Sequence, residues 1–216
     1  MGELELLKIL ASILALVVAV VGHEIMHGWV AWRYGDPTAK SMGRLSVNPL
    51  KHIDPVGTIL VPAILYATHA PFLFGWAKPV PIDMRIVIRN GGYGAAIAVS
   101  LAGITYNLIL AILLATFLPL AYPPQSLLGA FFYLFLVQSV MLNVVLAVFN
   151  LWPIPPLDGS QALRFLAARL GWQGFVDAYE KIYPYGMLIL FAILFTPLSS
   201  ILFAPVGWIL KMIIPG

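Results

Sequence analysis

The stretch from residue 4 to residue 31 reads LELLKILASILALVVAVVGHEIMHGWVA, and it decides the class of fold. An apolar run of this length exceeds the ~20 residues that a helix needs to cross a bilayer. Gly35, Asp36 and Pro37 follow it and stop a helix, so we expect a spanning helix over 4–34. The run has neither a basic leader nor a small-residue cleavage site, so we expect a retained helix and not a signal peptide.

The composition of the whole chain agrees with a membrane protein. Hydrophobic residues make up 61% of the 216 residues and charged residues only 10%, whereas soluble domains carry about 25% charged residues. The net charge is only +3 and the basic residues are scattered, which excludes nucleic-acid binding as the main function. The chain has no cysteine, so any bound metal must be held by His, Asp or Glu.

The other apolar runs extend this prediction to an all-α polytopic membrane protein. We predict four spanning helices, at 4–34, 95–120, 127–150 and 184–203. A shorter apolar run at 55–75 is interrupted by prolines, and a further short helix is expected at 205–214. The chain shows no internal repeat, so we expect a single domain over 1–216, with its core at 4–160 and C-terminal membrane segments within 184–214.

The first predicted helix carries an H-E-x-x-H motif at residues 23–27. Four residues complete slightly more than one turn, so His23 and His27 share a face about 6 Å apart along the axis. Two imidazoles at this spacing can occupy adjacent corners of a zinc tetrahedron, and Glu24 beside them can act as a general base on water. The alternative is a pair of buried histidines that hydrogen-bond within the bundle. Ionisable residues in an apolar helix are costly and usually functional, which favours the metal site.

A catalytic zinc site needs a third protein ligand. The candidates outside the motif are His52, His69, Asp36, Asp54, Asp83, Asp158, Asp177 and Glu180. Asp158 stands out, because the prolines of 150–159 (NLWPIPPLDG) impose an extended path directly after a spanning helix. Irregular backbone at membrane depth is tolerated where it lines a wet cavity. A proline-rich turn outside the membrane, with Asp158 at its tip, is the alternative for this segment taken alone.

Taken together, these motifs resemble the site-2 protease family of intramembrane zinc metalloproteases (M50 type), and in particular its short members without a PDZ domain. The similarity covers residues 20–160 and includes the segments 35–39, 43–55, 74–81, 102–107 and 150–159. One departure is Ile104, which stands where the family usually has proline.

The resemblance implies a site with one zinc ion per chain, bound by His23, His27 and Asp158, with Glu24 as the base. It further implies that Asn150 orients the substrate or stabilises the oxyanion, and that Asn107 lines the site. The two-His-one-carboxylate set by itself also suits iron.

The function expected from the motifs and the resemblance is endopeptidase cleavage within or near transmembrane helices of other membrane proteins. A non-catalytic metal-binding scaffold on the same fold is the alternative, although such a protein has no need of Glu24. A metal transporter is disfavoured because the spans 95–120 and 127–150 contain no charged residue.

The shared metal also predicts the topology in the membrane. If His23 and Asp158 bind one ion, the loops after Tyr34 and Asn150 lie on the same side, and 55–75 must then be a re-entrant or interfacial hairpin. Ten of the twelve basic residues fall on that side, all except Lys8 and Lys211. The positive-inside rule makes this side cytoplasmic and leaves the N-terminus outside the cell. A full span over 55–75 is the alternative, and simple hydropathy favours it.

The segment 75–83 (GWAKPVPID) is predicted to be extended. We expect it to lie at the cytoplasmic mouth of the site and to hold an unwound substrate as an added strand, with Trp76 and Lys78 lining the site. A simple cytoplasmic connector is the alternative for this segment.

Overall fold

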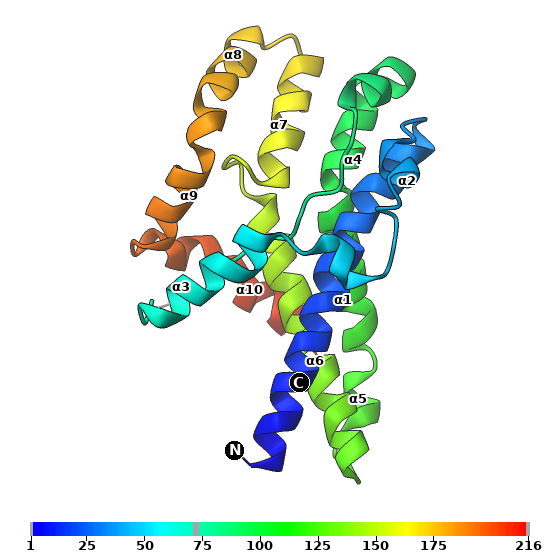
Figure 1. Ribbon diagram of the computed structural model, residues 1–216, viewed down its shortest axis with the longest axis vertical. Coiled ribbons are helices and arrows are strands. Elements are labelled where there is room, and N and C mark those ends of the chain that lie inside the picture. Colours follow the sequence, from blue (N-terminus) through cyan, green and yellow to red (C-terminus); the bar gives the residue numbers. More distant parts are fainter. Residues whose placement is uncertain (1, 71–73, 215–216) are drawn as a thin grey trace.

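The computed structural model describes residues 2–70 and 74–214 and contains no strand among them. Three long helices stand side by side: α1 (Glu3–Arg33), α4 (Met84–Ala115) and α6 (Leu127–Leu151) (Figure 1). Within the described residues, these three helices are individually long and apolar enough to cross a membrane. The predicted all-α membrane fold is confirmed, as are the expected helices over 4–34 and 127–150.

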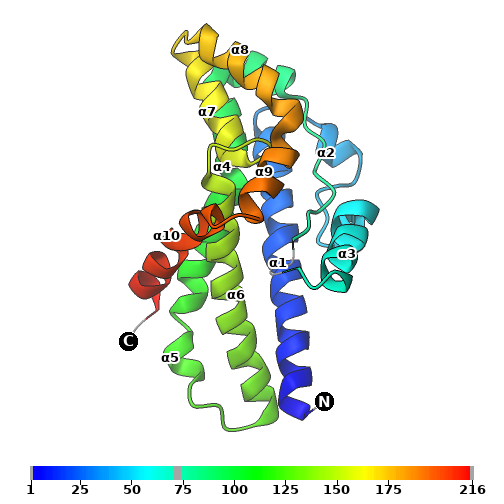
Figure 2. The ribbon, with the colours of Figure 1, turned by 90° about the vertical axis from the view of Figure 1, so that its left-hand side faces the viewer.

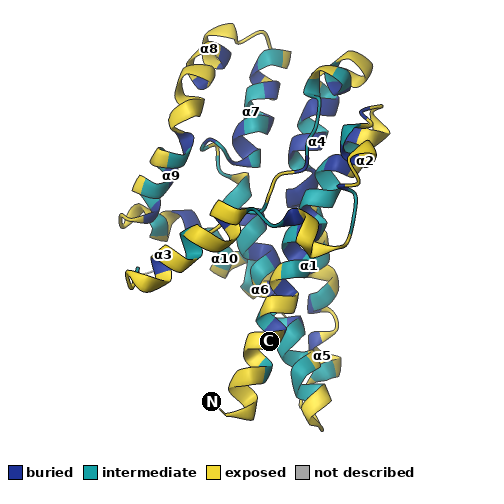
Figure 3. Ribbon diagram, in the orientation of Figure 1, coloured by how far each residue is buried: buried dark blue, intermediate teal, exposed yellow. Residues whose placement is uncertain are grey.

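Small residues let α1 pack closely against α4 and α6. Ala11, Ala15 and Ala19 recur every four residues along one face of α1, and each is fully buried. Close approach over small side chains is how helices associate in a bilayer, where burying apolar surface gives little gain. The opposite face of the same half of α1 exposes Leu6 and Ile13, as expected for a helix surrounded by lipid. Figure 3 shows how much of the N-terminal half of α1 is exposed.

The second spanning helix is longer at its start than the sequence indicates. The range 95–120 was expected, but α4 begins at Met84 and ends at Ala115. Asp83 caps its N-terminus by accepting from the Arg85 N–H, and the Arg85 guanidinium holds the pKa of the Asp83 carboxyl below its usual value. Gly92, at φ 67°, kinks the helix between its polar start and its apolar body. The short helix α5 (Leu118–Ala121) follows after a break.

The segment 55–75 was expected to be a hairpin, and the structure describes all of it except residues 71–73. A π-helical turn η2 (Pro55–Leu60) leads into α3 (Val61–Ala67), which projects sideways from the bundle in Figure 1. Residue 76 lies next to the first turn of the segment, since the Trp76 N–H donates to the Gly57 carbonyl at 3.1 Å. Pro62 lies in the first turn of α3, where no N–H donor is needed. Before this hairpin come two short elements, α2 (Thr38–Ser41) and η1 (Pro49–His52).

The C-terminal part corrects a further prediction. After α7 (Asp158–Arg169), the chain forms α8 (Gln173–Ile182), η3 (Tyr183–Tyr185), α9 (Gly186–Leu194) and α10 (Leu198–Ile213). No straight span covers 184–203, because the chain bends by 80° between α9 and α10, at a break next to Pro197. The separate helix at 205–214 is also absent, since α10 runs through Pro205. Figure 2 shows α10 directed away from α9. With the bent pair counted as one span, the described residues provide up to four.

Candidate active site

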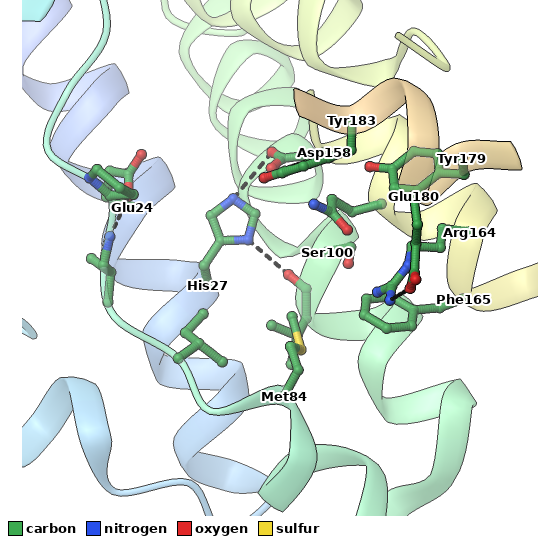
Figure 4. Close-up of a pocket in the computed structure, with 15 residues that line it drawn as sticks. Glu24, His27, Met84, Ser100, Asp158, Arg164, Phe165, Tyr179, Glu180 and Tyr183 are labelled. Atoms are coloured by element: carbon green, nitrogen blue, oxygen red, sulfur yellow. Dashed lines mark hydrogen bonds and ion pairs between the residues drawn. The ribbon is translucent and has the colours of Figure 1, made fainter. Parts of the chain in front are cut away.

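Three side chains from distant parts of the sequence converge where α1 meets the start of α7. His23 and His27 project from one face of α1, with their Nε2 atoms 3.1 Å apart. Asp158 is the first residue of α7, and its Oδ2 lies 3.0 Å from His23 Nε2 and 3.1 Å from His27 Nε2. Figure 4 shows the contact between Asp158 and His27. The predicted ligand set therefore comes together in space, and it is the one such group of His, Asp or Glu found among residues 2–70 and 74–214.

Hydrogen bonds on the far side of each ring determine which nitrogen faces the cluster. His27 Nδ1 lies 2.7 Å from the Val99 carbonyl of α4. A carbonyl can only accept, so Nδ1 carries the proton, and in the neutral imidazole Nε2 keeps its lone pair. His23 Nδ1 lies 2.6 Å from Asn107 Oδ1, which accepts a hydrogen bond from it in the same way. Both histidines thus offer an unprotonated Nε2 to the cluster, as metal binding requires.

The Asn107 amide is itself held in one orientation by a chain of buried polar groups. Asn107 Nδ2 donates to the Ala19 carbonyl at 3.2 Å and to Asn143 Oδ1 at 2.7 Å. Asn143 Nδ2 in turn donates to the Ser139 carbonyl. Asn107 and Asn143 are both fully buried, and this chain fixes Asn107 Oδ1 toward His23. Asn107 was expected to line the site, but it lies behind the ligand, and the sequence reasoning missed Asn143 altogether. The feature that could have identified Asn143 is that it places a polar amide in the middle of an apolar span.

The donor set fits a zinc ion. Ligand atoms at about 2.0–2.1 Å from a tetrahedral zinc lie roughly 3.3–3.4 Å from one another. The observed separations of 3.0–3.1 Å among the two Nε2 atoms and Asp158 Oδ2 are close to that edge length. Two imidazoles and one carboxylate also leave a fourth corner free, which is the pattern of catalytic zinc sites.

Gly103 of α4 explains how α4 can pass so close to the cluster. A Cβ atom at this position would collide with the rings of His23 and His27, including the Nε2 ligand atom of His27. Only glycine leaves room for both imidazoles here, so the Ala-Gly dipeptide at 102–103 serves the packing of the site.

Glu24 lies next to the cluster and is held by the segment 75–83. Its Oε2 accepts a hydrogen bond from the Val80 N–H at 3.0 Å, and Figure 4 shows this contact beside His27. The segment crosses α1 at Gly28, where a Cβ would press on the side chain of Val80. One carboxylate oxygen is therefore anchored and the other is available to the pocket.

A cavity of about 560 Å³ opens beside these residues. Glu24, His27 and Asp158 lie at one end of it, and Pro79 and Val80 contribute to one wall. The wall that faces them is formed by α7 and α8, where Arg164 pairs with Glu180 (Figure 4). The cavity thus joins the candidate metal site to an opening lined by polar and aromatic side chains.

Three predicted site residues lie away from this cavity. Asn150 donates from Nδ2 to the Leu146 carbonyl of its own helix and does not line the cavity. Its backbone carbonyl instead approaches Gly159 beside the candidate ligand Asp158. Trp76 packs over Gly57, and the Lys78 side chain is exposed. Pro79 and Val80, and not Trp76 and Lys78, line the cavity.

Comparison with known proteins gives a consistent picture. Residues 125–194 match the model of peptidase family M50. The chain is 37% identical over 201 residues to YwhC of Bacillus subtilis (strain 168), whose name designates it a zinc metalloprotease, covering 89% of this chain and 84% of that protein.

Two more distant relatives carry the same designation. Rip2 of Mycolicibacterium smegmatis is 32% identical over 142 residues (66% of this chain, 51% of that protein). Rip2 of Mycobacterium tuberculosis (strain H37Rv) is 32% identical over 148 residues (68% and 54%). No solved structure shows a significant match.

Proposed function

This chain belongs to peptidase family M50 and is a zinc metalloprotease, and on that premise we propose that it cleaves transmembrane helices of other membrane proteins within the bilayer. The observation that carries the proposal is the position of the ligands. The apolar part of α1 begins after Lys8, and His23 lies about 21 Å beyond Ile9 along the helix, at 1.5 Å per residue. Because the hydrocarbon core of a bilayer is about 30 Å thick, this distance supports a site within the membrane, toward one face.

The residues of the site support peptide hydrolysis. Zinc bound by His23, His27 and Asp158 would polarise the scissile carbonyl and activate water. Glu24 is placed to accept the proton of the attacking water and to return it to the leaving amine. The Val80 N–H bond leaves one Glu24 oxygen free for this transfer. Asn107 and the Val99 carbonyl keep both histidines in the ligating tautomer throughout.

The segment 76–83 supports the idea that the substrate binds as an added strand. The backbone N–H groups of Trp76, Lys78 and Val80 all bond to the body of the protein. The Ala77 N–H and carbonyl and the carbonyls of Pro79 and Pro81 have no partner in the part of the chain that the structure describes. A helix hides its backbone groups, so a substrate that unwinds beside this edge would regain hydrogen bonds there. Because the prolines offer no N–H, Ala77 is the one donor on that edge.

A variant tests this edge directly. Ala77→Pro removes the outward donor from an already extended segment. We expect it to raise KM several-fold for a helical substrate while leaving the zinc content unchanged. An unchanged KM would refute the strand mode and favour a simple connector.

The membrane orientation follows from the charges. The polar ends of α2, α4, α7 and α8 lie at the end of the bundle opposite the N-terminus and α5 (Figure 1), and Lys40, Arg85, Arg89 and Arg169 belong to them. By the positive-inside rule this end is cytoplasmic. We therefore propose a multi-pass protein of the cell membrane with its active site near the cytoplasmic face.

Zinc content measured together with cleavage tests the proposed function. The wild type, Glu24→Gln and Asp158→Ala are purified in detergent and assayed against a reporter protein with a single transmembrane helix. We expect about one zinc per chain in the first two, weaker zinc binding in Asp158→Ala, and cleavage by the wild type alone. Zinc binding without cleavage by the wild type would favour the non-catalytic scaffold, and absence of zinc would refute the site.

A further inference from the structure

The segment 76–83 is held at four backbone N–H groups by other parts of the chain. These bonds run from Trp76 N–H to the Gly57 carbonyl (3.1 Å), from Lys78 N–H to the His52 carbonyl (2.9 Å), from Val80 N–H to Glu24 Oε2 (3.0 Å) and from Asp83 N–H to Asp36 Oδ2 (2.7 Å). The Lys78 carbonyl also accepts from a terminal guanidinium nitrogen of Arg44 at 2.8 Å.

Two of these anchors are charged side chains withdrawn from water. Asp36 is fully buried, and its other oxygen accepts from the Thr38 N–H. Arg44 is 8% exposed, and its Nε is buried with no hydrogen-bond partner. Neither residue forms an ion pair within residues 2–70 and 74–214.

Burying a charge without an opposite charge is unfavourable, so a role confined to stability explains this pair poorly. What Asp36 and Arg44 have in common is the segment that they bind. Arg44 holds it two residues before Val80, and Asp36 holds it three residues after. Between these two points the Val80 N–H meets Glu24.

We propose that Arg44 and Asp36 are positioning residues that hold the Val80 N–H against Glu24, and this inference rests on the proposed role of Glu24 as the base. Both come from the loop that follows the metal-binding helix, so the same stretch of chain supplies the base and the groups that fix its partner. When either anchor is removed, the segment moves away from α1 and the Glu24 carboxylate rotates. The three ligands of the candidate zinc site make no hydrogen bond to the segment, so zinc stays bound.

Hydrogen exchange of the full-length protein in detergent is the first test. The wild type is compared with Arg44→Met, Asp36→Ala and the matched control Lys51→Met. Lys51 also donates to a carbonyl of this loop, that of Gly43 at 3.0 Å, but it is exposed and does not touch the segment. In Arg44→Met and Asp36→Ala we expect exchange across residues 76–83 to accelerate about ten- to hundredfold, as loss of a bond to a charged group predicts. Lys51→Met should exchange like the wild type.

Cleavage of the single-helix reporter is the second test. For Arg44→Met we expect kcat to fall about ten- to hundredfold, as for other small displacements of catalytic groups, with the zinc content at the wild-type level. Arg44→Lys retains a donor and should restore part of kcat. The exchange measurement needs no substrate, so it still tests the two anchors if the wild type fails to cleave, a failure that counts only against the proposed function.

Two results would overturn the inference. One is unchanged exchange at 76–83 in both Arg44→Met and Asp36→Ala. The other is a loss of zinc and a general loss of protection in step with kcat, which would assign the two side chains to folding of the loop as a whole.

Discussion

Replacing Asn107 by leucine tests whether the amide behind His23 matters to the metal. The substitution keeps the approximate size of the side chain but removes three hydrogen bonds, to His23 Nδ1, the Ala19 carbonyl and Asn143 Oδ1. Without its acceptor, the His23 proton is free to move to Nε2. That tautomer presents an N–H to the metal in place of a lone pair. The proton must therefore return to Nδ1 before His23 can bind zinc.

The size of the effect follows from the bonds that are lost. Mutation of the hydrogen-bond partner of a metal ligand typically lowers metal affinity 10–100-fold, or about 1.4–2.7 kcal/mol. The fold itself should lose less than a water-soluble core would. Hydrogen bonds between membrane helices average about 0.6 kcal/mol each, so three of them predict about 2 kcal/mol and a protein that still folds.

The assay is a competition for zinc between the purified protein and a chromophoric chelator. Asn143→Leu is the matched control, because it removes one bond to Asn107 and leaves the bond to His23 intact. We expect Asn107→Leu to lose at least tenfold in zinc affinity and Asn143→Leu to lose only a few-fold. Thermal unfolding of both zinc-free variants separates effects on the fold from effects on the metal.

Two outcomes would refute this reasoning. Wild-type zinc affinity in Asn107→Leu would mean that the tautomer of His23 is fixed by something other than Asn107. Equal losses in the two variants would mean that the buried amides act on the packing of α4 against α6 and not on the ligand.

Three further substitutions probe close contacts in the fold. Gly103→Ala places a Cβ against both imidazoles and should lower zinc affinity at least tenfold. Gly207→Ala is the control, because its Cβ meets open space in α10, and it should leave zinc affinity unchanged. Equal affinities of the two variants in the competition assay would contradict this prediction. Gly22→Ala drives a methyl into the ring of Tyr106 and should destabilise the protein by about 1–3 kcal/mol in thermal unfolding, and an unchanged melting temperature would show that the ring moves freely. Trp152→Phe removes the indole hydrogen bond to the Leu202 carbonyl of α10 and should lower the free energy of unfolding by about 0.5–1.5 kcal/mol. Hydrogen exchange should become faster in α10 alone, and faster exchange throughout the chain would contradict a local role for this bond.

Local patterns together with the family resemblance predicted the candidate metal centre. His23 and His27 face the same way because they lie one helical turn apart, and no tertiary contact is needed to place them together. Asp158 was identified by its position after a proline-rich segment and by resemblance to a family, and the structure brings it within 3.1 Å of both histidines. The hairpin at 55–75 was predicted by a constraint on topology, because two ligands of one ion must lie on the same side.

Other features of the structure were not predicted. Hydropathy placed the start of the second span at residue 95, but the polar turn at 84–91 is helical because Asp83 caps it. The interruption between α9 and α10 was hidden in a continuous apolar run, since hydropathy measures composition and not direction. Asn150 has the residue type expected of an oxyanion donor, yet its amide bonds to its own helix.

The sequence by itself determined a helical membrane protein with two histidines on one face of a helix, because these follow from local periodicity and from the cost of polar groups in lipid. The resemblance to a family added Asp158 as the expected third ligand. Only the tertiary structure decided what holds those groups. Asn143 reaches His23 through Asn107, and Val80 reaches Glu24 across 56 positions of sequence. A hydrogen bond between distant segments depends on how the helices pack and where the chain between them runs. The local pattern of residues predicts neither.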